Sequence, residues 1–560
     1  MDTQLRLALA ASLSLAPLIP LSVRLAQLQV MQHRVLESRA SGEFNRSTQE
    51  ITPRADIVDR DGKILAHSVS TWSCFVERSM VRDARALSQR LAKLLSMPED
   101  EVLRKLKARG RFASVKTDLD FDQYTAVSRA RLEGVGLAVS QQRFYPNEDL
   151  ARGVLGLVGS DSKGLSGVEL AFESKLTGGS RRLEYIRDGS GRTIYKGAGQ
   201  RAQALEPLRL TIDRNIQYYA EEALKEASEK FQIKGGLIAV QDPQTGEILA
   251  MAASPANALK NPIIQDTYEP GSTFKVIAAA AALEDGLLKE DETVFCENGL
   301  YEVSPGVFIH DHEPAGALTL QGILERSSNI GIAKVVERVG PNRFYRMSRA
   351  FGFSNKSGLA LPGETSGDLK PLSDLTRVTL AASSYGYGVG VSALQVLNAY
   401  SAIANGGTLY EPVINKDGRK PVKVRRVASA RTVESLGRML ENIVERGTGA
   451  TAQIPGYRLA GKTGTARKLD RATMKYSQSQ YVASFAGYLP AGAPRWTVLV
   501  VIDEPKGQYY GGQVAAPIFA KLGLRLLTLK GVPPEAPPAA GPMPTPGLWK
   551  LPALAPGRKR

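Results

Sequence analysis

Ser272 and Lys275 stand three residues apart where a Pro-Gly turn leads into an alanine-rich stretch. Pro and Gly interrupt regular structure, and the run of alanines that follows predicts a helix. At a helix start, residues i and i+3 lie on one face, about 5–6 Å apart between Cβ atoms. A buried lysine loses its proton readily, and a helix N-terminus favours negative charge on the serine oxygen. The pair therefore predicts a nucleophile and its base, although an ordinary helix cap beside an exposed lysine would have the same spacing.

The sequence Ser327-Ser-Asn329 stands just before a second helical pattern. Ser327 has a hydroxyl that can relay a proton, and Asn329 has an amide that can bind the amide of a substrate. A serine at this place can also cap the helix that follows, so Ser327 or Ser328 fits a purely structural interpretation as well. The pattern indicates catalysis only together with Ser272 and Lys275.

Lys462 begins a Lys-Thr-Gly-Thr sequence on an expected strand. The lysine offers positive charge to a substrate carboxylate, and Thr463 follows it. Gly464 lets a substrate lie close against the strand, and Thr465 offers both a backbone N–H and a hydroxyl. These residues predict a surface that holds an extended, negatively charged peptide end.

Two similar patterns and one short polar cluster are not expected to take part. Ser160-Asp-Ser-Lys163 repeats the first spacing, but "GLSG" follows it, so a loop is predicted rather than a helix. Lys356-Ser-Gly358 likewise lies in a loop-like stretch. "HDHE", His310 to Glu313, offers few and consecutive candidate ligands, so a surface loop without a metal is predicted.

The elements that must position these residues follow from periodicity. A short strand and a long amphipathic helix are predicted over 208–231, and a hairpin that turns at Pro243 to Gly246 follows. Upstream, 55–68 predicts two short strands around an Asp-Gly turn, and 83–110 predicts two helices. The change in pattern places a domain boundary near residue 205.

Composition bounds the class of protein. The chain has 560 residues, enough for two or three domains, and its formal charge is 72 − 56 = +16. That charge suits either a basic solvated surface or an anionic neighbour such as lipid headgroups or cell-wall polymers. No long Lys/Arg run with interleaved aromatic residues occurs, so nucleic acid is not an expected partner. Two cysteines, far apart, predict a fold that does not depend on disulfides.

The N-terminus predicts attachment to a membrane. Leu7 to Val23 is an uncharged stretch of 17 residues between Arg6 and Arg24. This length is short for a span, and Pro17 and Pro20 would kink it. A cleaved signal peptide is the alternative, but no clean small-x-small cleavage site follows, so an uncleaved single-pass anchor is favoured.

The three patterns in this order, Ser-x-x-Lys, Ser-x-Asn and Lys-Thr-Gly, are the signature of penicillin-binding proteins and related serine β-lactamases. The surrounding segments "ADIVDRDGKILAHS", "GLSGVELAFESKLTGG", "YEPGSTFKV" and "SFAGYLP" resemble class B penicillin-binding proteins, and "GTARK" with "IDEPKGQYYGGQVAAPIF" resembles their division-type branch. The resemblance covers about 24–529. Ala55 stands where the family often has Gly, and "VSAL" where it often has Val-Thr-Pro-Leu; neither touches the catalytic set.

This resemblance implies the fold. It predicts an α/β (α+β) serine transpeptidase/β-lactamase-like domain with an antiparallel sheet between helical layers, preceded by a β-rich pedestal and one N-terminal transmembrane helix. The expected divisions are an anchor at 1–25, a juxtamembrane helix or linker at 26–50, the pedestal at 51–205, the transpeptidase domain at 206–529, and a disordered Pro/Ala-rich tail at 530–560.

The resemblance also implies the chemistry, peptidoglycan D,D-transpeptidation without metal or cofactor. Ser272 would attack the carbonyl between the last two D-alanines of a stem peptide, and Lys275 would take its proton. The oxyanion would lie between the backbone N–H groups of Ser272 and Thr465. Ser327 would help to deliver a proton to the departing D-alanine, and Asn329 would hold the donor peptide. The terminal carboxylate of that peptide would be bound by Lys462, Thr463 and Thr465.

The implied setting is the bacterial inner membrane at the septum, with the catalytic domain outside the cytoplasm. The implied partners are stem peptides as donor and acceptor, β-lactams, division proteins and a glycosyltransferase of the shape-elongation-division-sporulation family. Several alternatives stay open: an elongation or sporulation transpeptidase, a β-lactamase or penicillin sensor, and a non-enzymatic division scaffold.

Overall fold

The computed structural model describes residues 17–37, 45–159, 161–178, 180–187, 193–196, 205–470 and 475–535, together with residues 4, 10, 13 and 473. The chain divides into two compact units. One comprises 1–55, 68–141 and 174–206, and the other comprises 56–67, 142–173 and 207–560.

An antiparallel sheet forms the centre of the larger unit. Among its described residues, five strands are joined in the order β10-β9-β21-β20-β19, and every neighbouring pair is antiparallel. The predicted hairpin is confirmed, with its turn at Gly246 in the left-handed region, φ 79°. The strands are β9 (Gly235–Gln241), β10 (Ile248–Ser254), β19 (Ala460–Asp470), β20 (Lys475–Leu489) and β21 (Trp496–Asp503).

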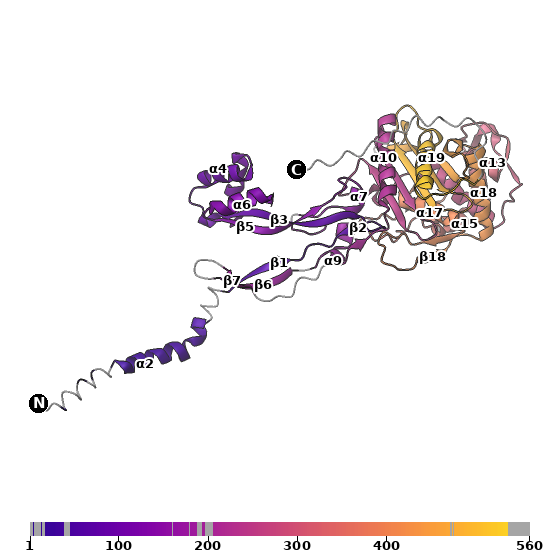
Figure 1. Ribbon diagram of the computed structural model, residues 1–560. Coiled ribbons are helices and arrows are strands. Elements are labelled where there is room, and N and C mark those ends of the chain that lie inside the picture. Colours follow the sequence, from indigo (N-terminus) through magenta and orange to yellow (C-terminus); the bar gives the residue numbers. More distant parts are fainter. Residues whose placement is uncertain are drawn as a thin grey trace. The chain divides into compact units, whose positions relative to one another are not determined.

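Two long helices cover one face of this sheet. α10 (Arg214–Phe231) and α19 (Gly511–Leu529) pack against each other and against the strands (Figure 1). Alternate strand residues such as Ile238, Val500 and Phe485 enter the apolar core between them. Burial of each such side chain contributes about 1.5–3 kcal/mol. The predicted strand and amphipathic helix are thereby confirmed as β8 (Leu208–Arg209) and α10.

A fully buried helix covers the opposite face. In α17 (Ala393–Ala404) every residue is buried, including the polar residues Gln395, Asn398 and Ser401. Gln241 of β9, next to the inward-facing Val240, donates to Asn398 and accepts from Ser401 of this helix. The antiparallel sheet therefore lies between helical layers, as predicted.

The alanine-rich stretch forms the helix that carries the site. The 3-10 turn η3 (Gly271–Phe274) passes directly into α12 (Lys275–Glu284), whose residues from Lys275 to Ala282 are buried. Around α12 lie α13 (Leu320–Glu325), α14 (Asn329–Val339), α15 (Pro341–Ala350), α16 (Arg377–Ser384) and α18 (Ala430–Arg446).

The smaller unit combines strands and helices. β3 (Ile64–Glu77) pairs with β4 (Phe112–Leu119) and with β5 (Val135–Phe144). The two predicted helices are confirmed as α4 (Ala84–Leu95) and α5 (Glu99–Lys107). With α6 (Phe121–Ala130) they enclose one apolar core with β3 and β4, so the expectation of a β-rich pedestal is met only in part.

Three further strands belong to the smaller unit: β1 (Asn45–Ile51), β6 (Ser180–Arg187) and β7 (Thr193–Lys196). In the larger unit, β2 (Ile57–Val58) pairs with the start of β3 across the predicted Asp-Gly turn, where Gly62 has φ 86°. α7 (Arg152–Leu155) and α8 (Gly167–Ala171) follow in the same unit.

The N-terminal helix begins close to the prolines. α2 (Leu18–Ala26) continues into a π-helical turn, Gln27–Met31. None of the helices in the described residues has the length and apolar character required to cross a bilayer. Residues 7–9, 11, 12 and 14–16 of the predicted span from Leu7 to Val23 lie outside the described residues, as does the predicted tail beyond residue 535.

Candidate active site

Ser272 lies in the turn that leads into α12. Gly271, just before it, has φ 56°, and its N–H donates to the Gly386 carbonyl at 3.3 Å. Ser272 is half-buried, whereas the side chain of Lys275 at the helix start is fully buried. The sequence expectation of a serine and a lysine at one helix start is confirmed, with a 3-10 turn in place of the first α-helical turn.

The two lysines meet at Ser327. Nζ of Lys275 donates to the Ser327 backbone carbonyl and, at 3.1 Å, to its Oγ. Nζ of Lys462 donates to the same Oγ at 3.0 Å. Ser327 adopts a left-handed backbone with φ 56°, a conformation that costs a non-glycine residue about 1–3 kcal/mol. Three residues predicted from separate segments are thus in direct contact.

Burial changes the proton affinity of both lysines. Desolvation holds the pKa of Lys275 well below its ordinary value of 10.5, nearby Lys462 lowers it further, and Asp311 opposes the shift. Desolvation also lowers the pKa of Lys462 to about 7. A lowered pKa makes the neutral amine more abundant, and the neutral amine has a lone pair that can accept the proton of a hydroxyl.

Lys275 does not hydrogen-bond to Ser272 among the described residues; its hydrogen bonds go to Ser327. Catalytic hydrogen bonds are often completed only when substrate is bound. Because both lysines contact Ser327 Oγ, a proton can pass from either lysine to the other through this hydroxyl.

Asn329 begins α14, and Asp311 fixes its position. The Asp311 carboxylate accepts from Ser328 Oγ, from the Asn329 N–H at 2.5 Å and from the Ile330 N–H at 3.0 Å. Negative charge at a helix N-terminus stabilises the helix. The side chain of Asn329 donates to the His310 carbonyl at 3.1 Å.

Sequence reasoning missed Asp311. It belongs to "HDHE", for which a surface loop is predicted; His310 instead ends β13 (Val307–His310), and Asp311 to Glu313 follow the strand as a loop. Asp311 nevertheless caps the helix of the Ser-Ser-Asn sequence, a contact across 17 residues to Ser328 that no local pattern reveals. Among the residues that the structure describes, no cluster of His, Cys, Asp and Glu could hold a metal ion.

The Lys-Thr-Gly-Thr sequence lies on β19, the last strand in the described sheet order. An edge strand has free backbone groups with which an extended peptide can pair. Thr463 Oγ1 lies 2.8 Å from Thr448 Oγ1, and Thr465 Oγ1 accepts from the Gly511 N–H at 3.0 Å.

Gly464 is also required for packing within the protein. A Cβ at this position would lie 2.3 Å from Ser484 Oγ and 3.0 Å from the carbonyl oxygen of Pro270. The glycine therefore lets β19 approach both β20 and the turn that precedes Ser272.

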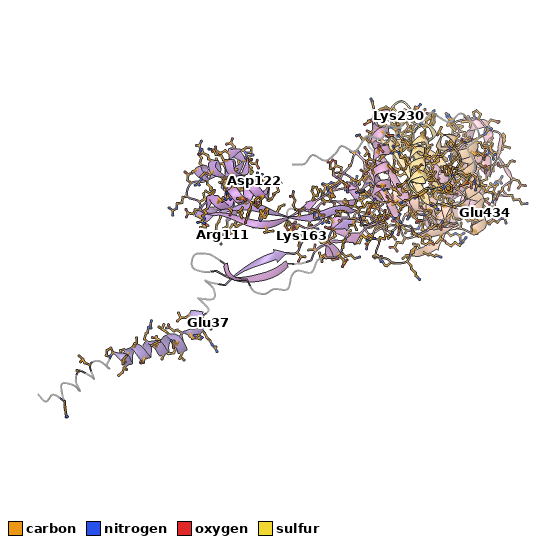
Figure 2. All side chains as sticks on the ribbon, viewed as in Figure 1. Glu37, Arg111, Asp122, Lys163, Lys230 and Glu434 are labelled. Atoms are coloured by element: carbon orange, nitrogen blue, oxygen red, sulfur yellow. The ribbon has the colours of Figure 1, made fainter. Side chains whose placement is uncertain are left out.

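The two similar patterns lie away from this cluster of contacts. Residues 161–163 form a turn in which Lys163 is exposed and pairs with Asp161 at 3.6 Å (Figure 2); Ser160 itself lies outside the described residues. Lys356 to Gly358 is a loop in which the Ser357 hydroxyl donates to Glu364. Both loop predictions are confirmed for the residues described.

The depressed pKa of Lys462 predicts how stability depends on pH. The unfolded chain keeps this proton up to about pH 10.5, whereas the folded protein loses it near pH 7. Between these values the unfolded state binds more protons, so this group makes the free energy of unfolding rise with pH. Below pH 7 the folded protein bears the full cost of a buried charge.

We therefore expect Lys462→Met to gain stability relative to wild type most below pH 7, with the difference shrinking toward pH 10. Thermal melts from pH 6 to 10 measure this, with Lys163→Met at an exposed site as control. Lys275 contributes a rise of the same sign in both proteins, and this rise is smaller in the variant because Lys462 no longer lowers the pKa of Lys275, so the expected trend keeps its direction. A difference between wild type and Lys462→Met that is independent of pH would contradict the lowered pKa of the buried lysine.

Comparison with known proteins identifies both parts of the chain. The sequence model of the penicillin binding protein transpeptidase domain matches residues 236–523. That of the penicillin-binding protein dimerisation domain matches residues 49–208.

Sequence similarity to known proteins extends over nearly the whole length of the chain. The peptidoglycan D,D-transpeptidase FtsI of Escherichia coli is 32% identical over 554 residues, covering 95% of this chain and 93% of the relative. Stage V sporulation protein D of Bacillus subtilis is 31% identical over 546 residues, covering 92% of this chain and 84% of the relative.

Solved structures of peptidoglycan-synthesising and penicillin-binding proteins are similar to this structure. A peptidoglycan synthetase from Bifidobacterium adolescentis superposes with a TM-score of 0.68 at 27% identity, over 88% of this chain and 98% of that one. Penicillin-binding protein 3 of Mycobacterium tuberculosis, complexed with ampicillin, superposes with a TM-score of 0.65 at 26% identity, over 89% and 98%.

Proposed function

The chain belongs to the penicillin-binding protein transpeptidases, and we propose that it crosslinks peptidoglycan as a serine D,D-transpeptidase of septal wall synthesis. The observation that carries the proposal is the meeting of two buried lysines at Ser327, close in the fold to the turn of Ser272. A lysine base with a lowered pKa, Lys275, beside a half-buried serine suits acyl transfer. An edge strand with Lys462, whose pKa of about 7 lets it hold a proton when a carboxylate is bound, suits a peptide that ends in a carboxylate.

In acylation, Ser272 Oγ attacks the carbonyl carbon between the two terminal D-alanines, and its proton passes to Lys275. The oxyanion is held by the backbone N–H groups of Ser272 and Thr465. The C–N bond then breaks. Ser327, in contact with both lysines, relays the proton from Lys275 to the nitrogen of the departing D-alanine. Lys275 is then neutral again, and an ester on Ser272 remains.

In deacylation, the amine of a second stem peptide attacks this ester and gives a proton to Lys275. Lys275 passes this proton to Ser272 Oγ as the C–O bond of the ester breaks. The substrate is held at two places. Asn329 binds the donor peptide amide, and Lys462 with Thr463 and Thr465 binds the terminal carboxylate. Gly464 lets the peptide lie against β19. No metal or cofactor enters this scheme.

The proposed domain divisions agree with the family matches. A pedestal over 51–205 and a transpeptidase domain over 206–529 are supported by the matches to 49–208 and 236–523. The compact units divide differently, because 56–67 and 142–173 group with 207–560. The anchor at 1–25, the linker at 26–50 and the tail at 530–560 complete the proposed organisation.

A β-lactam would inhibit the enzyme by acylating Ser272, and this also separates the rival functions. A transpeptidase keeps a long-lived penicillin adduct and exchanges the terminal D-alanine of a pentapeptide for another D-amino acid. A β-lactamase hydrolyses penicillin with turnover, a sensor forms the adduct without exchange, and a scaffold does neither. We expect a stable adduct together with exchange; the test is to follow both with purified protein.

The septal role has one specific competitor. Similarity to Stage V sporulation protein D is as extensive as similarity to FtsI, so a sporulation or elongation enzyme is the second candidate. A functional fluorescent fusion decides between them. Septal enrichment in vegetative cells supports the division role, and a lateral-wall or forespore pattern supports the alternatives.

A membrane-embedded polymerase completes the proposed function. None of the residues above polymerises sugars, so glycan strands come from another protein, for which we propose a glycosyltransferase of the shape-elongation-division-sporulation family. The segment Leu7 to about Ala40 would anchor the chain in the inner membrane, with catalysis outside, and contact this partner. Its serines, alanines and two prolines suit close helix contact, because small residues let helices approach and prolines free backbone groups that seek partners.

We expect that exchanging Leu7–Val23 for an unrelated single span of similar length abolishes co-purification with the polymerase and lowers crosslinking of new strands. The isolated chimera should still form the penicillin adduct, which serves as its control. Wild-type crosslinking and co-purification by the chimera would show that the segment is an anchor only.

A further inference from the structure

Glu269, three residues before Ser272, joins separate segments around the nucleophile. Its Oε1 accepts from the Gly388 N–H at 2.7 Å and from the Tyr476 hydroxyl at 2.9 Å. Gly388 lies in the loop that follows α16, and Tyr476 lies near the start of β20. One carboxylate oxygen thus connects the nucleophile's own segment to a loop and to the sheet.

The loop held by Glu269 is itself in contact with the site. Besides accepting from the Gly271 N–H, Gly386 is so close that a Cβ there would lie 2.3 Å from the Gly271 carbonyl oxygen. One residue further on, Tyr387 Oη accepts at 3.0 Å from the N–H of Arg467, which lies two residues beyond Thr465 on β19. The loop therefore touches both the turn of Ser272 and the strand of Thr465.

Aromatic packing completes the connection. The ring of Tyr387 lies edge-on to that of Tyr476 with centroids 5.0 Å apart, so the loop and β20 are joined beside the carboxylate as well as through it. Displacing Glu269 would consequently loosen the loop on two sides.

The arrangement is costly for a merely structural residue. Oε2 of Glu269 is buried and has no hydrogen-bond partner among the described residues. Desolvation raises the pKa of this carboxyl, while the two hydrogen bonds at Oε1 oppose the shift. Because a half-satisfied buried carboxylate is unfavourable, apolar packing would stabilise the fold better, which points to a role in function.

We propose that Glu269 is a positioning residue for acylation, which holds the loop 385–388 so that the N–H groups of Ser272 and Thr465 keep the spacing of an oxyanion hole. This inference rests on the proposed function. Charge-assisted hydrogen bonds from two donors to one oxygen fix that spacing more firmly than neutral ones. Because the oxyanion exists only as the transition state is approached, the residue acts on the rate of acylation and not on initial penicillin binding.

The test is stopped-flow acylation with a fluorescent penicillin, which separates the dissociation constant of the first complex from the rate constant of acylation. We expect Glu269→Gln to lower the rate constant about tenfold, since a neutral acceptor replaces a charged one, and to leave the dissociation constant within about twofold. Glu434→Gln, an exposed residue of α18 labelled in Figure 2, is the matched control and should change neither.

Tyr476→Phe keeps the carboxylate and removes one donor, so it tests the inference even where Glu269→Gln folds poorly. We expect Tyr476→Phe to lower the acylation rate constant less than Glu269→Gln does. In the double variant, the fold-loss of this rate constant should be less than the product of the two single fold-losses, because both residues act through one contact. Wild-type acylation rates in either single variant, or an equal change in the dissociation constant, would overturn the inference. An absence of adduct in the wild-type protein would instead overturn the proposed function.

Discussion

Replacing Ser272 with alanine is expected to abolish covalent labelling by a fluorescent penicillin while the protein stays folded. The half-buried hydroxyl is the proposed nucleophile, and alanine fits the same turn without it. Loss of the nucleophile removes the covalent route altogether, so labelling should fall by more than about 10³-fold. Labelling on a denaturing gel and a thermal melt of the same sample measure both parts.

Ser160→Ala is the control for Ser272→Ala, since it removes the serine of the second Ser-x-x-Lys sequence. It should label as wild type does. Full labelling of Ser272→Ala, or loss of labelling only in Ser160→Ala, would mean that the nucleophile has been misassigned.

Lys275→Arg is expected to be nearly as damaging to acylation as Lys275→Ala. Arginine keeps the positive charge, but its guanidinium stays protonated in proteins and cannot act as a base. The wild-type side chain is fully buried, and its depressed pKa fits a neutral base rather than a charged helper. Removing a general base costs about 10²–10⁴ in rate, so both variants should acylate at least about 100-fold more slowly.

The measurement is the acylation rate constant of both Lys275 variants, beside Lys163→Arg as an exposed control. The melting temperatures of all proteins show whether the larger side chain disturbs the fold. A rate for Lys275→Arg within about tenfold of wild type, which is about 1.4 kcal/mol of barrier, would show that Lys275 acts only through its charge.

Local patterns predicted the elements whose residues interact with near neighbours. The α12 helix start, the β9–β10 hairpin and the long helix α10 all follow from turn residues and periodicity over fewer than 25 residues. Asp213, which caps α10 by accepting from the N–H groups of Asn215 and Ile216, shows how locally such a boundary is determined.

The assembly of the site could not be predicted in this way. No periodicity shows that Lys275, Ser327 and Lys462 converge, because their contacts span 52 and 135 residues. The resemblance to a known family grouped these residues, and the structure then placed them in contact. The roles of Asp311 and Glu269 could not be predicted either, because a carboxylate that accepts from backbone N–H groups of another segment has no signature in its own segment.

The central claim is that a stem peptide is transferred through an ester on Ser272, and mass spectrometry of the trapped intermediate tests it most directly. Wild-type protein is mixed with a pentapeptide donor that ends in D-alanyl-D-alanine, quenched in acid and digested. We predict that the peptide containing Ser272 carries the donor minus one D-alanine, and that an added D-amino acid removes this adduct as crosslinked or exchanged product forms. An adduct on any other residue, or release of D-alanine with no adduct on Ser272, would contradict the account.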